Sequence, residues 1–236
     1  MTDFDTVIIT YINHFSRHSC IVDHLFTFLA QSHLLKGTVL VTIMWGVTFK
    51  DNERQSHNRE RIIITSISCF VAMVLARLLA LTLPFRLRPL HEKSLHFLLP
   101  YGMSPTSLEH WSSFPSDHAV LFFSLSTGLL LISRKAGIFA LFYTAMFICF
   151  PRIYLGLHYP TDIIAGAVIG MTIVLLSNIY LIKSTWLQSI ANWSYSKPHL
   201  FFPVFFLLTY QIADMFEDIR SLVSEVVKLF GITLPS

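Results

Sequence analysis

The 236-residue chain is far more apolar than a soluble domain of its length. Hydrophobic residues make up 53% of it and charged residues only 13%, against roughly 25% charged residues in a typical soluble domain. The net charge of +3 comes without any run of lysine or arginine, which argues against a nucleic-acid-binding surface. The cysteines Cys20, Cys69 and Cys149 have the spacing of neither a metal site nor a disulfide framework. The composition therefore predicts a protein that is solvated largely by lipid.

The N-terminal part of the chain, residues 4–30, mixes apolar residues with charged ones. This mixture predicts one or two helices lying at the membrane interface rather than a membrane span. The first residues lack the positively charged start of a cleavable signal peptide, so we expect the first true membrane segment to direct insertion.

Six apolar stretches follow, each close to the roughly 17–25 residues that a bilayer core requires. They are residues 31–49, 61–83, 117–133, 136–151, 162–183 and 199–215. Only residues 133–135 separate the third stretch from the fourth, which predicts a tight helical hairpin. Residues 216–232 alternate charged and apolar positions and predict an amphipathic surface helix. The predicted fold is an all-α, polytopic membrane bundle of about six transmembrane helices with amphipathic terminal helices, forming one domain over residues 1–236 around a core at 60–183.

The sidedness of the loops follows from the order of these stretches. Because successive spans cross the membrane in opposite directions, the loops 84–116 and 151–161 should share one face. The opposite face collects the cationic residues Lys50, Arg54, Arg59, Arg61, Arg134, Lys135 and Lys183. Positively charged loops stay in the cytoplasm, so the loops 84–116 and 151–161 are expected to be extracytoplasmic. We expect the protein to reside in a bacterial inner (plasma) membrane.

Three short motifs lie on this extracytoplasmic face, each at the end of a span. Residues 86–89 read Arg-Leu-Arg-Pro, residues 115–118 read Pro-Ser-Asp-His, and Arg152, His158 and Asp162 bridge the fourth and fifth spans. Each motif alone has an ordinary explanation, as a helix start with its capping residues or as an interfacial arginine. Their coincidence at one membrane face of a chain with so few charges indicates a functional site.

Phosphoryl transfer is the chemistry that these side chains could perform. Its transition state spreads negative charge over three oxygen atoms, and the guanidinium groups of Arg88 and Arg152 match such oxygens. The backbone N–H groups after Ser116 open a helix and can bind an anion. One imidazole can attack phosphorus, a second can protonate the leaving oxygen, and a carboxylate can support the cation that forms. These parts require no metal and no other cofactor.

The three motifs resemble the signature of the type 2 phosphatidic-acid phosphatase superfamily, which reads K-x6-R-P, then P-S-G-H, then S-R-x5-H-x3-D. The resemblance covers the order of the motifs, the spans between them and most of residues 60–183, and the third motif matches in its spacing throughout. It implies that His158 is the nucleophile, that Asp162 is its partner, and that His118 is first the acid and then the base. It further implies that the phosphoryl group is held by Arg88, Ser116 and Arg152.

The chain departs from this signature at three positions. Leu81 stands where the family has lysine, Asp117 where it has glycine, and Pro151 where it has serine. The missing lysine removes a positive charge from the phosphate site, and Arg86 and Arg77 are the candidate substrate-binding replacements. Arg77 lies one turn before Leu81 on the same helical face, although its side chain would have to extend against the usual lean toward the helix N-terminus. Asp117 is also counted among the substrate-binding residues, because its position at the helix start keeps a backbone N–H for the phosphate whatever the side chain. Its carboxylate, placed next to a phosphate, would need to point away or be compensated.

The resemblance predicts a membrane enzyme that hydrolyses a lipid phosphate or diphosphate through a phosphohistidine, without a metal. An extracytoplasmic site favours a polyprenyl diphosphate such as undecaprenyl diphosphate, with a phosphatidate-type lipid next. A lipid phosphotransferase using the same intermediate and a non-catalytic membrane lipid-binding protein are the alternatives. A vanadium haloperoxidase would be soluble, which the apolar stretches oppose. The expected partners are the lipid phosphate and the bilayer, with no nucleic acid, and the sequence leaves the oligomeric state open.

Overall fold

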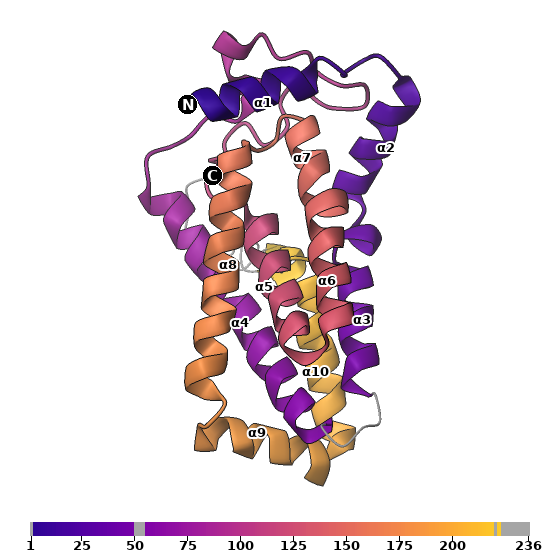
Figure 1. Cartoon of the computed structure of the whole chain (residues 1–236), viewed down its shortest axis with the longest axis vertical. Helices are drawn as coiled ribbons and strands as arrows, with labels where there is room; N and C mark the ends of the chain where they lie inside the picture. Colours follow the sequence, from indigo (N-terminus) through magenta and orange to yellow (C-terminus); the bar gives the residue numbers. More distant parts are fainter. Residues whose placement is uncertain (1, 50–54, 220, 223–236) are drawn as a thin grey trace.

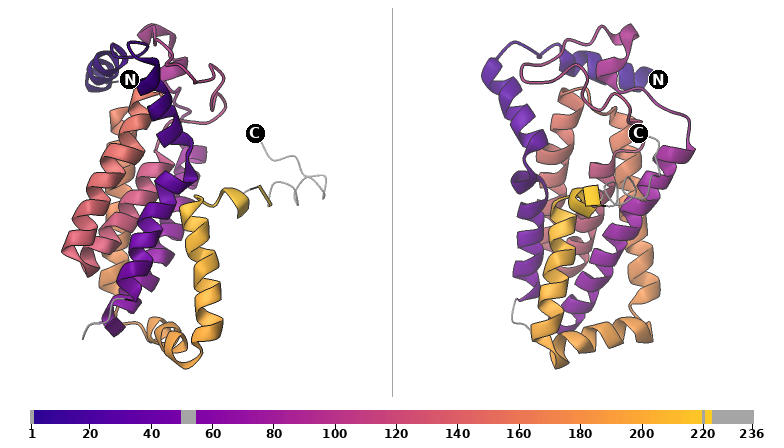
Figure 2. Two further views of the ribbon diagram at one scale, coloured as in Figure 1. Left: turned by 90° about the vertical axis from the view of Figure 1, so that its right-hand side faces the viewer. Right: turned by 180° about the vertical axis from the view of Figure 1, so that it is seen from behind.

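The computed structural model describes residues 2–49, 55–219 and 221–222. The regular secondary structure in these ranges is entirely helical. The predicted all-α fold is confirmed. Most helices run along the length of the molecule, whereas α1 (Asp3–Asn13) lies across one end and α9 (Thr185–Ser196) across the other (Figures 1 and 2). The two ends of the molecule can therefore be told apart by α1 and α9, and the end with α1 is called the α1 end below.

The N-terminal segment forms two helices, of which only one lies across the end of the bundle as an interfacial helix would. α1 begins with Thr2 as its N-cap, whose hydroxyl accepts from the N–H of Asp5. α2 (Cys20–Gln31) instead leads into η1 (Leu34–Thr38) and α3 (Val39–Thr48) across a 70° bend, and the pair together has the length and composition of a broken span or re-entrant loop. The bend follows from the extended backbone of Ser32, which ends α2.

Three continuous helical runs are long and apolar enough to cross a bilayer: Ser56–Thr82, Arg134–Tyr154 and Pro160–Leu181. They correspond to α4 (Gln55–Thr82), to α6 (Arg134–Tyr143) continued by η4 (Thr144–Cys149) and α7 (Phe150–Tyr154), and to α8 (Pro160–Leu181). The bent α2–α3 pair raises the count to four. These lengths and compositions indicate an integral membrane protein.

The six apolar stretches all lie in helices, but the count of six spans is not confirmed. α5 (Asp117–Ile132) and α10 (Pro198–Ala213) have 16 residues each, slightly short of the roughly 17–25 residues that a helix needs to cross the hydrocarbon core. The predicted hairpin between the third and fourth stretches is confirmed. Ser133 closes α5 with its N–H, which donates to the Leu129 carbonyl at 2.8 Å, and its hydroxyl caps α6.

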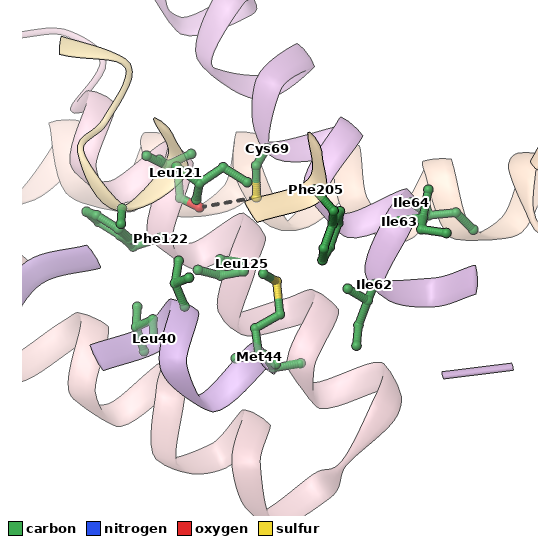
Figure 3. Packing of buried hydrophobic residues seen from close by; sticks show 14 of the residues in the cluster. Leu40, Met44, Ile62, Ile63, Ile64, Cys69, Leu121, Phe122, Leu125 and Phe205 are labelled. Atoms are coloured by element: carbon green, nitrogen blue, oxygen red, sulfur yellow. Dashed lines mark hydrogen bonds between the residues drawn. The ribbon is translucent and has the colours of Figure 1, made fainter. Parts of the chain in front are cut away.

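α5 lies at the centre of the bundle, between α4 and α8. Its apolar side chains, including Leu121, Phe122 and Leu125, pack with residues of α3, α4 and α10 (Figure 3). α8 approaches α5 closely because it has glycine at the contact: a Cβ on Gly170 would lie 2.2 Å from the carbonyl oxygen of Val120. Cys69 is fully buried within the same cluster, as its apolar surroundings in the sequence predict.

The C-terminal part contains one helix that the sequence analysis did not predict. α9 begins at the N-cap Ser184 and links the end of α8 to the start of α10 across the far end of the bundle (Figure 2). The amphipathic helix predicted at 216–232 lies mostly outside the described residues, so that prediction is not tested. Lys50 and Arg54, two of the cations assigned to the cytoplasmic face, also lie outside them.

The end of α4, the end of α7 and the starts of α5 and α8 meet at the α1 end of the molecule (Figure 1). The connection from α4 to α5 also lies there and contains two short 3-10 turns, η2 (Pro89–His91) and η3 (Lys93–Leu95). This arrangement confirms that the three motifs share one end.

Candidate active site

The long connection between α4 and α5 is held in place by polar side chains of the N-terminal segment. The Asn13 amide donates to the Leu98 carbonyl and accepts from the Leu98 N–H, both at 2.8 Å. The buried Asp23 carboxylate accepts from the N–H of Tyr101 at 2.9 Å and from the hydroxyl of Tyr154 at the end of α7. The sequence analysis assigned these residues to an interfacial helix and missed this role.

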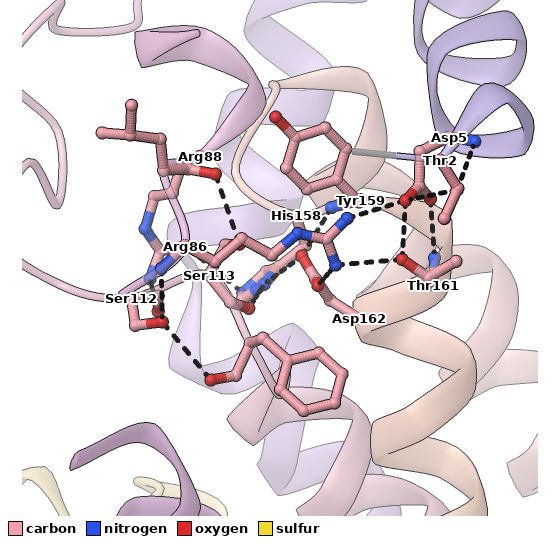
Figure 4. A network of polar contacts seen from close by, with 12 residues as sticks. Thr2, Asp5, Arg86, Arg88, Ser112, Ser113, His158, Tyr159, Thr161 and Asp162 are labelled. Carbon is pink, nitrogen blue, oxygen red and sulfur yellow. Dashed lines mark hydrogen bonds and ion pairs between the residues drawn. The ribbon is translucent and has the colours of Figure 1, made fainter. Parts of the chain in front are cut away.

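His158 lies in the short connection between α7 and α8 and is only 4% exposed. Its Nδ1 is 2.8 Å from the carbonyl oxygen of Ser113. Because a carbonyl can only accept, Nδ1 is the donor, and the neutral ring carries its lone pair on Nε2. That Nε2 lies 3.4 Å from Nη1 of Arg88. The nitrogen that could attack phosphorus is therefore unprotonated and next to a guanidinium (Figure 4).

Asp162 is fully buried in the first turn of α8. Its Oδ2 accepts from the Tyr159 N–H at 2.8 Å and lies 3.8 Å from Nδ1 of His158, too far for a hydrogen bond. The family resemblance implies that Asp162 is the partner of His158. In this structure the Ser113 carbonyl selects the tautomer, and Asp162 contributes a nearby negative charge.

Arg88 is 6% exposed and is held by backbone carbonyls. Its guanidinium donates to Trp111 at 3.1 Å, to Leu157 at 2.6 Å and to Ser112 at 3.2 Å. Burial lowers the pKa of Arg88 to about 10, so the side chain remains cationic at neutral pH. The three carbonyls orient this charge without cancelling it.

Arg152, in α7, is 4% exposed and brings the second histidine into the site. Its Nη2 donates to the Ala30 carbonyl at 3.1 Å and also contacts Nε2 of His118. Since arginine can only donate, Nε2 of His118 is the acceptor in this contact. Nε of Arg152 is buried and has no hydrogen-bond partner among the described residues, which leaves a donor for a ligand oxygen.

Ser116 links the starts of α5 and α8. Its hydroxyl caps α5 by accepting from the Ala119 N–H at 3.5 Å, and its own N–H donates to the Asp162 carbonyl at 3.3 Å. A Cβ on Gly166 would lie 2.8 Å from the Ser116 carbonyl oxygen, so this contact requires glycine in α8. The predicted phosphate ligand Ser116 is buried as a cap, and its neighbour His118 is partly exposed.

Two of the departures from the family signature are related to each other. Nη2 of Arg77 lies 2.7 Å from Oδ2 of Asp117, and the guanidinium stacks 4.6 Å from the ring centre of Trp111. Arg77 thus compensates Asp117, while Leu81 is 78% exposed and points away. The third departure, Pro151, lies where η4 passes into α7 within one continuous helical run.

Arg86, the other candidate for the missing cation, lies between two carboxylates (Figure 4). Its Nη1 is 2.5 Å from Oδ1 of Asp162, and its Nη2 is 2.7 Å from Oδ2 of Asp5. Sequence reasoning missed Asp5, which is fully buried. The buried face of α1 consists of Asp5, Ile9 and Asn13, which are spaced four residues apart. A carboxylate at the spacing of a buried helical face was the feature of the sequence that could have identified Asp5.

The electrostatics of the site favour a neutral His158. Burial lowers its pKa, the charges of Arg88 and Arg152 lower it further, and Asp162 opposes them. The net shift is downward, so the ring is unprotonated at neutral pH. A neutral imidazole with its lone pair on Nε2 is the form that a nucleophile requires.

Comparisons with known proteins identify the family of this chain. Residues 62–186 match the PAP2 superfamily. The chain is 25% identical to undecaprenyl-diphosphatase BcrC of Bacillus subtilis over 69% of this chain and 76% of that protein. It is 29% identical to the bacitracin transport permease protein BcrC of Bacillus licheniformis, over 68% and 72% of the two chains. An undecaprenyl-diphosphatase of Sulfolobus acidocaldarius is 30% identical over 50% of this chain and 54% of its own. No solved structure matches. The match over more than half of its length places this chain in the PAP2 superfamily.

Proposed function

We propose that this protein hydrolyses a polyprenyl diphosphate such as undecaprenyl diphosphate, through a phosphohistidine formed on His158. Family membership and the relatives named as undecaprenyl-diphosphatases support hydrolysis of a lipid phosphate. The observation that carries the proposal is the unprotonated Nε2 of His158, 3.4 Å from the Arg88 guanidinium in a buried site.

The first half-reaction forms the phosphohistidine. Nε2 of His158 attacks the terminal phosphorus, and the bond to the bridging oxygen of the lipid breaks. His118 acts in its doubly protonated form: it donates a proton to that leaving oxygen, which gives the lipid monophosphate and leaves His118 as the neutral ring. Arg88 and Arg152 offset the charge on the phosphoryl oxygens, and Asp162 supports the cationic ring.

The second half-reaction returns the enzyme to its starting state. His118, now lacking the proton it donated, takes a proton from water as the water attacks phosphorus. The N–P bond breaks, inorganic phosphate leaves, and the lone pair returns to Nε2 of His158. His118 gives up one proton in the first half-reaction and regains one in the second, so its protonation state is unchanged over the whole cycle.

The chemistry is proposed to need no divalent metal. Hard cations prefer clustered carboxylates, whereas Asp162 and Asp117 are each paired with an arginine here. Activity should therefore survive a chelator. Loss of activity in the chelator, followed by recovery with Mg²⁺, would contradict this part of the proposal.

The test of the function is phosphate release from a panel of detergent-solubilised lipid monophosphates and diphosphates. We expect undecaprenyl diphosphate to lead and His158→Ala to abolish turnover, with His199→Ala, an exposed histidine in α10, as the matched control. A diphosphate labelled at its terminal phosphorus should leave label on the protein, stable in base and labile in acid. A panel without turnover, or a fully active His158→Ala, would overturn the proposal.

The active site is proposed to face the extracytoplasmic side. Cys20 is exposed, so the test uses a Cys20→Ser background. In intact cells an impermeant thiol reagent should label Lys93→Cys, at the active-site end, but not Lys135→Cys, at the α5–α6 turn. Labelling of Lys135→Cys alone would place the site in the cytoplasm and remove the preference for a polyprenyl carrier.

A further inference from the structure

Asp5 is a fully buried carboxylate that belongs to none of the three motifs. Its Oδ2 accepts from the Thr161 hydroxyl at 2.8 Å and from Arg86 at 2.7 Å, and its Oδ1 accepts from the Thr161 N–H at 3.1 Å. Burial alone would raise the pKa of Asp5, but the hydrogen bonds from Thr161 and Arg86 outweigh it and the pKa is lowered. Asp5 is therefore ionised at neutral pH.

Asp5 reaches the nucleophile through two intermediates. Arg86 joins Asp5 to Asp162, and the Asp162 carboxylate lies 3.8 Å from Nδ1 of His158. The Thr161 hydroxyl also accepts from Arg86 at 3.0 Å, which helps to hold the guanidinium between the two carboxylates (Figure 4). The chain of contacts therefore runs from α1 to the reacting ring.

The charges explain why two carboxylates are needed. Arg86 alone would neutralise Asp162, the carboxylate beside the ring. Among the described residues, the other charged groups that act on His158 are Arg88, from the α4–α5 connection, and Arg152, from α7, and both oppose a cationic ring. With Asp5 included, two carboxylates and one guanidinium leave one net negative charge near His158.

We propose that Asp5 is a positioning residue that holds Arg86 away from the phosphate and keeps the negative charge of Asp162 available to the His158 imidazolium. The inference rests on the proposed function, because that imidazolium forms during phosphoryl transfer. Asp5 touches neither the phosphate nor His158, so it acts through Arg86 and Asp162. On this proposal α1 carries a residue that positions the catalytic groups, in addition to covering the end of the bundle.

Asp5→Asn tests the charge while keeping the shape and one acceptor oxygen. We expect kcat to fall roughly tenfold with KM nearly unchanged, because binding does not involve Asp5. Removing a negative charge disfavours the protonated ring, so the pKa of His158 falls. The acid limb of the pH–rate profile, which reports protonation of His158, should then move to lower pH. Asp3→Asn is the matched control, since Asp3 is exposed on the same helix.

Arg86→Gln separates this role from a purely structural one. In that background, Asp5→Asn should cost much less than it does in the native protein, because its effect passes through Arg86. A structural role would lower the melting temperature in both backgrounds without moving the acid limb.

The decisive measurement is an NMR titration of the His158 ring in micelles, which needs no turnover. A lower pKa in Asp5→Asn and an unchanged one in Asp3→Asn are expected. An unchanged or higher pKa in folded Asp5→Asn would overturn the inference.

If the native enzyme shows no phosphate release, the proposed function fails, while the titration still decides the role of Asp5. If Asp5→Asn does not fold, Thr161→Val, which removes one hydroxyl contact to Asp5, should shift the pKa in the same direction by less, and no shift there would overturn the inference.

Discussion

Two pairs of arginines lie at the active-site end, and they differ in what holds them. Arg88 and Arg152 are 6% and 4% exposed, and their guanidinium groups contact backbone carbonyls and imidazole nitrogens. Arg77 and Arg86 have side chains that are 25% and 24% exposed, and each is paired with a carboxylate. A carbonyl orients a guanidinium without neutralising it, whereas a carboxylate cancels its charge. We expect the inner pair, Arg88 and Arg152, to bind the phosphate and the outer pair, Arg77 and Arg86, to arrange the site.

The largest expected effect comes from removing an inner arginine. Arg88→Gln and Arg152→Gln should each lower kcat by about 10²–10³-fold, the usual cost of removing one preorganised donor to a developing charge. Phosphate release per folded molecule measures this. Arg59→Gln is the control, because the Arg59 guanidinium stacks 4.4 Å from the ring centre of Tyr195 in α9, at the end of the molecule opposite the site. A loss of kcat below tenfold in both Arg88→Gln and Arg152→Gln would contradict the assignment of the inner pair to phosphate binding.

A smaller effect is expected for the outer Arg77. Arg77→Leu should lower turnover about tenfold, because it leaves the Asp117 carboxylate unpaired next to an anionic substrate. The double variant Arg77→Leu with Asp117→Gly should recover most of the activity, since it removes the pair as a unit. If the double variant stays as slow as Arg77→Leu, Arg77 itself contacts the phosphate, as one of the two sequence hypotheses holds.

The smallest expected effect is a shift in pH dependence. The charge of Arg88 lowers the pKa of His158, so removing that charge favours the protonated ring and raises the pKa. The acid limb of residual Arg88→Gln activity should therefore move to higher pH. Arg88→Lys keeps the charge and should leave the limb in place. Equal shifts in both variants would show that orientation, rather than charge, is responsible.

The fold was largely predictable because hydrophobic runs and helix length are local properties. The six apolar stretches are helical and the hairpin at Ser133 is present, since composition and short turns decide both. α9 was not predicted, because its alternation of polar and aromatic residues is short and resembles an interfacial connection. The number of spans also depends on where each helix ends, which caps and bends decide.

The candidate site residues could be named from the sequence, but the network of contacts among them could not. His118, His158, Asp162, Arg88 and Arg152 were named from the motifs, and the structure brings them to one end. Arg86 and Arg77 were interchangeable candidates for one missing charge, and the structure gives each of them a different carboxylate. Asp5 was not a candidate, since a single acidic residue in an N-terminal helix has an ordinary surface explanation.

The sequence by itself determined which chemical groups stand at which end, because each motif closes or opens an apolar helix and successive spans alternate direction. Only the tertiary structure decided which group pairs with which. Two contacts of the site network join residues far apart in the sequence: Ser113 with His158, 45 positions apart, and Asp5 with Thr161, 156 positions apart. No helical period relates positions so distant, so these pairings follow from how α1, α8 and the α4–α5 connection pack together.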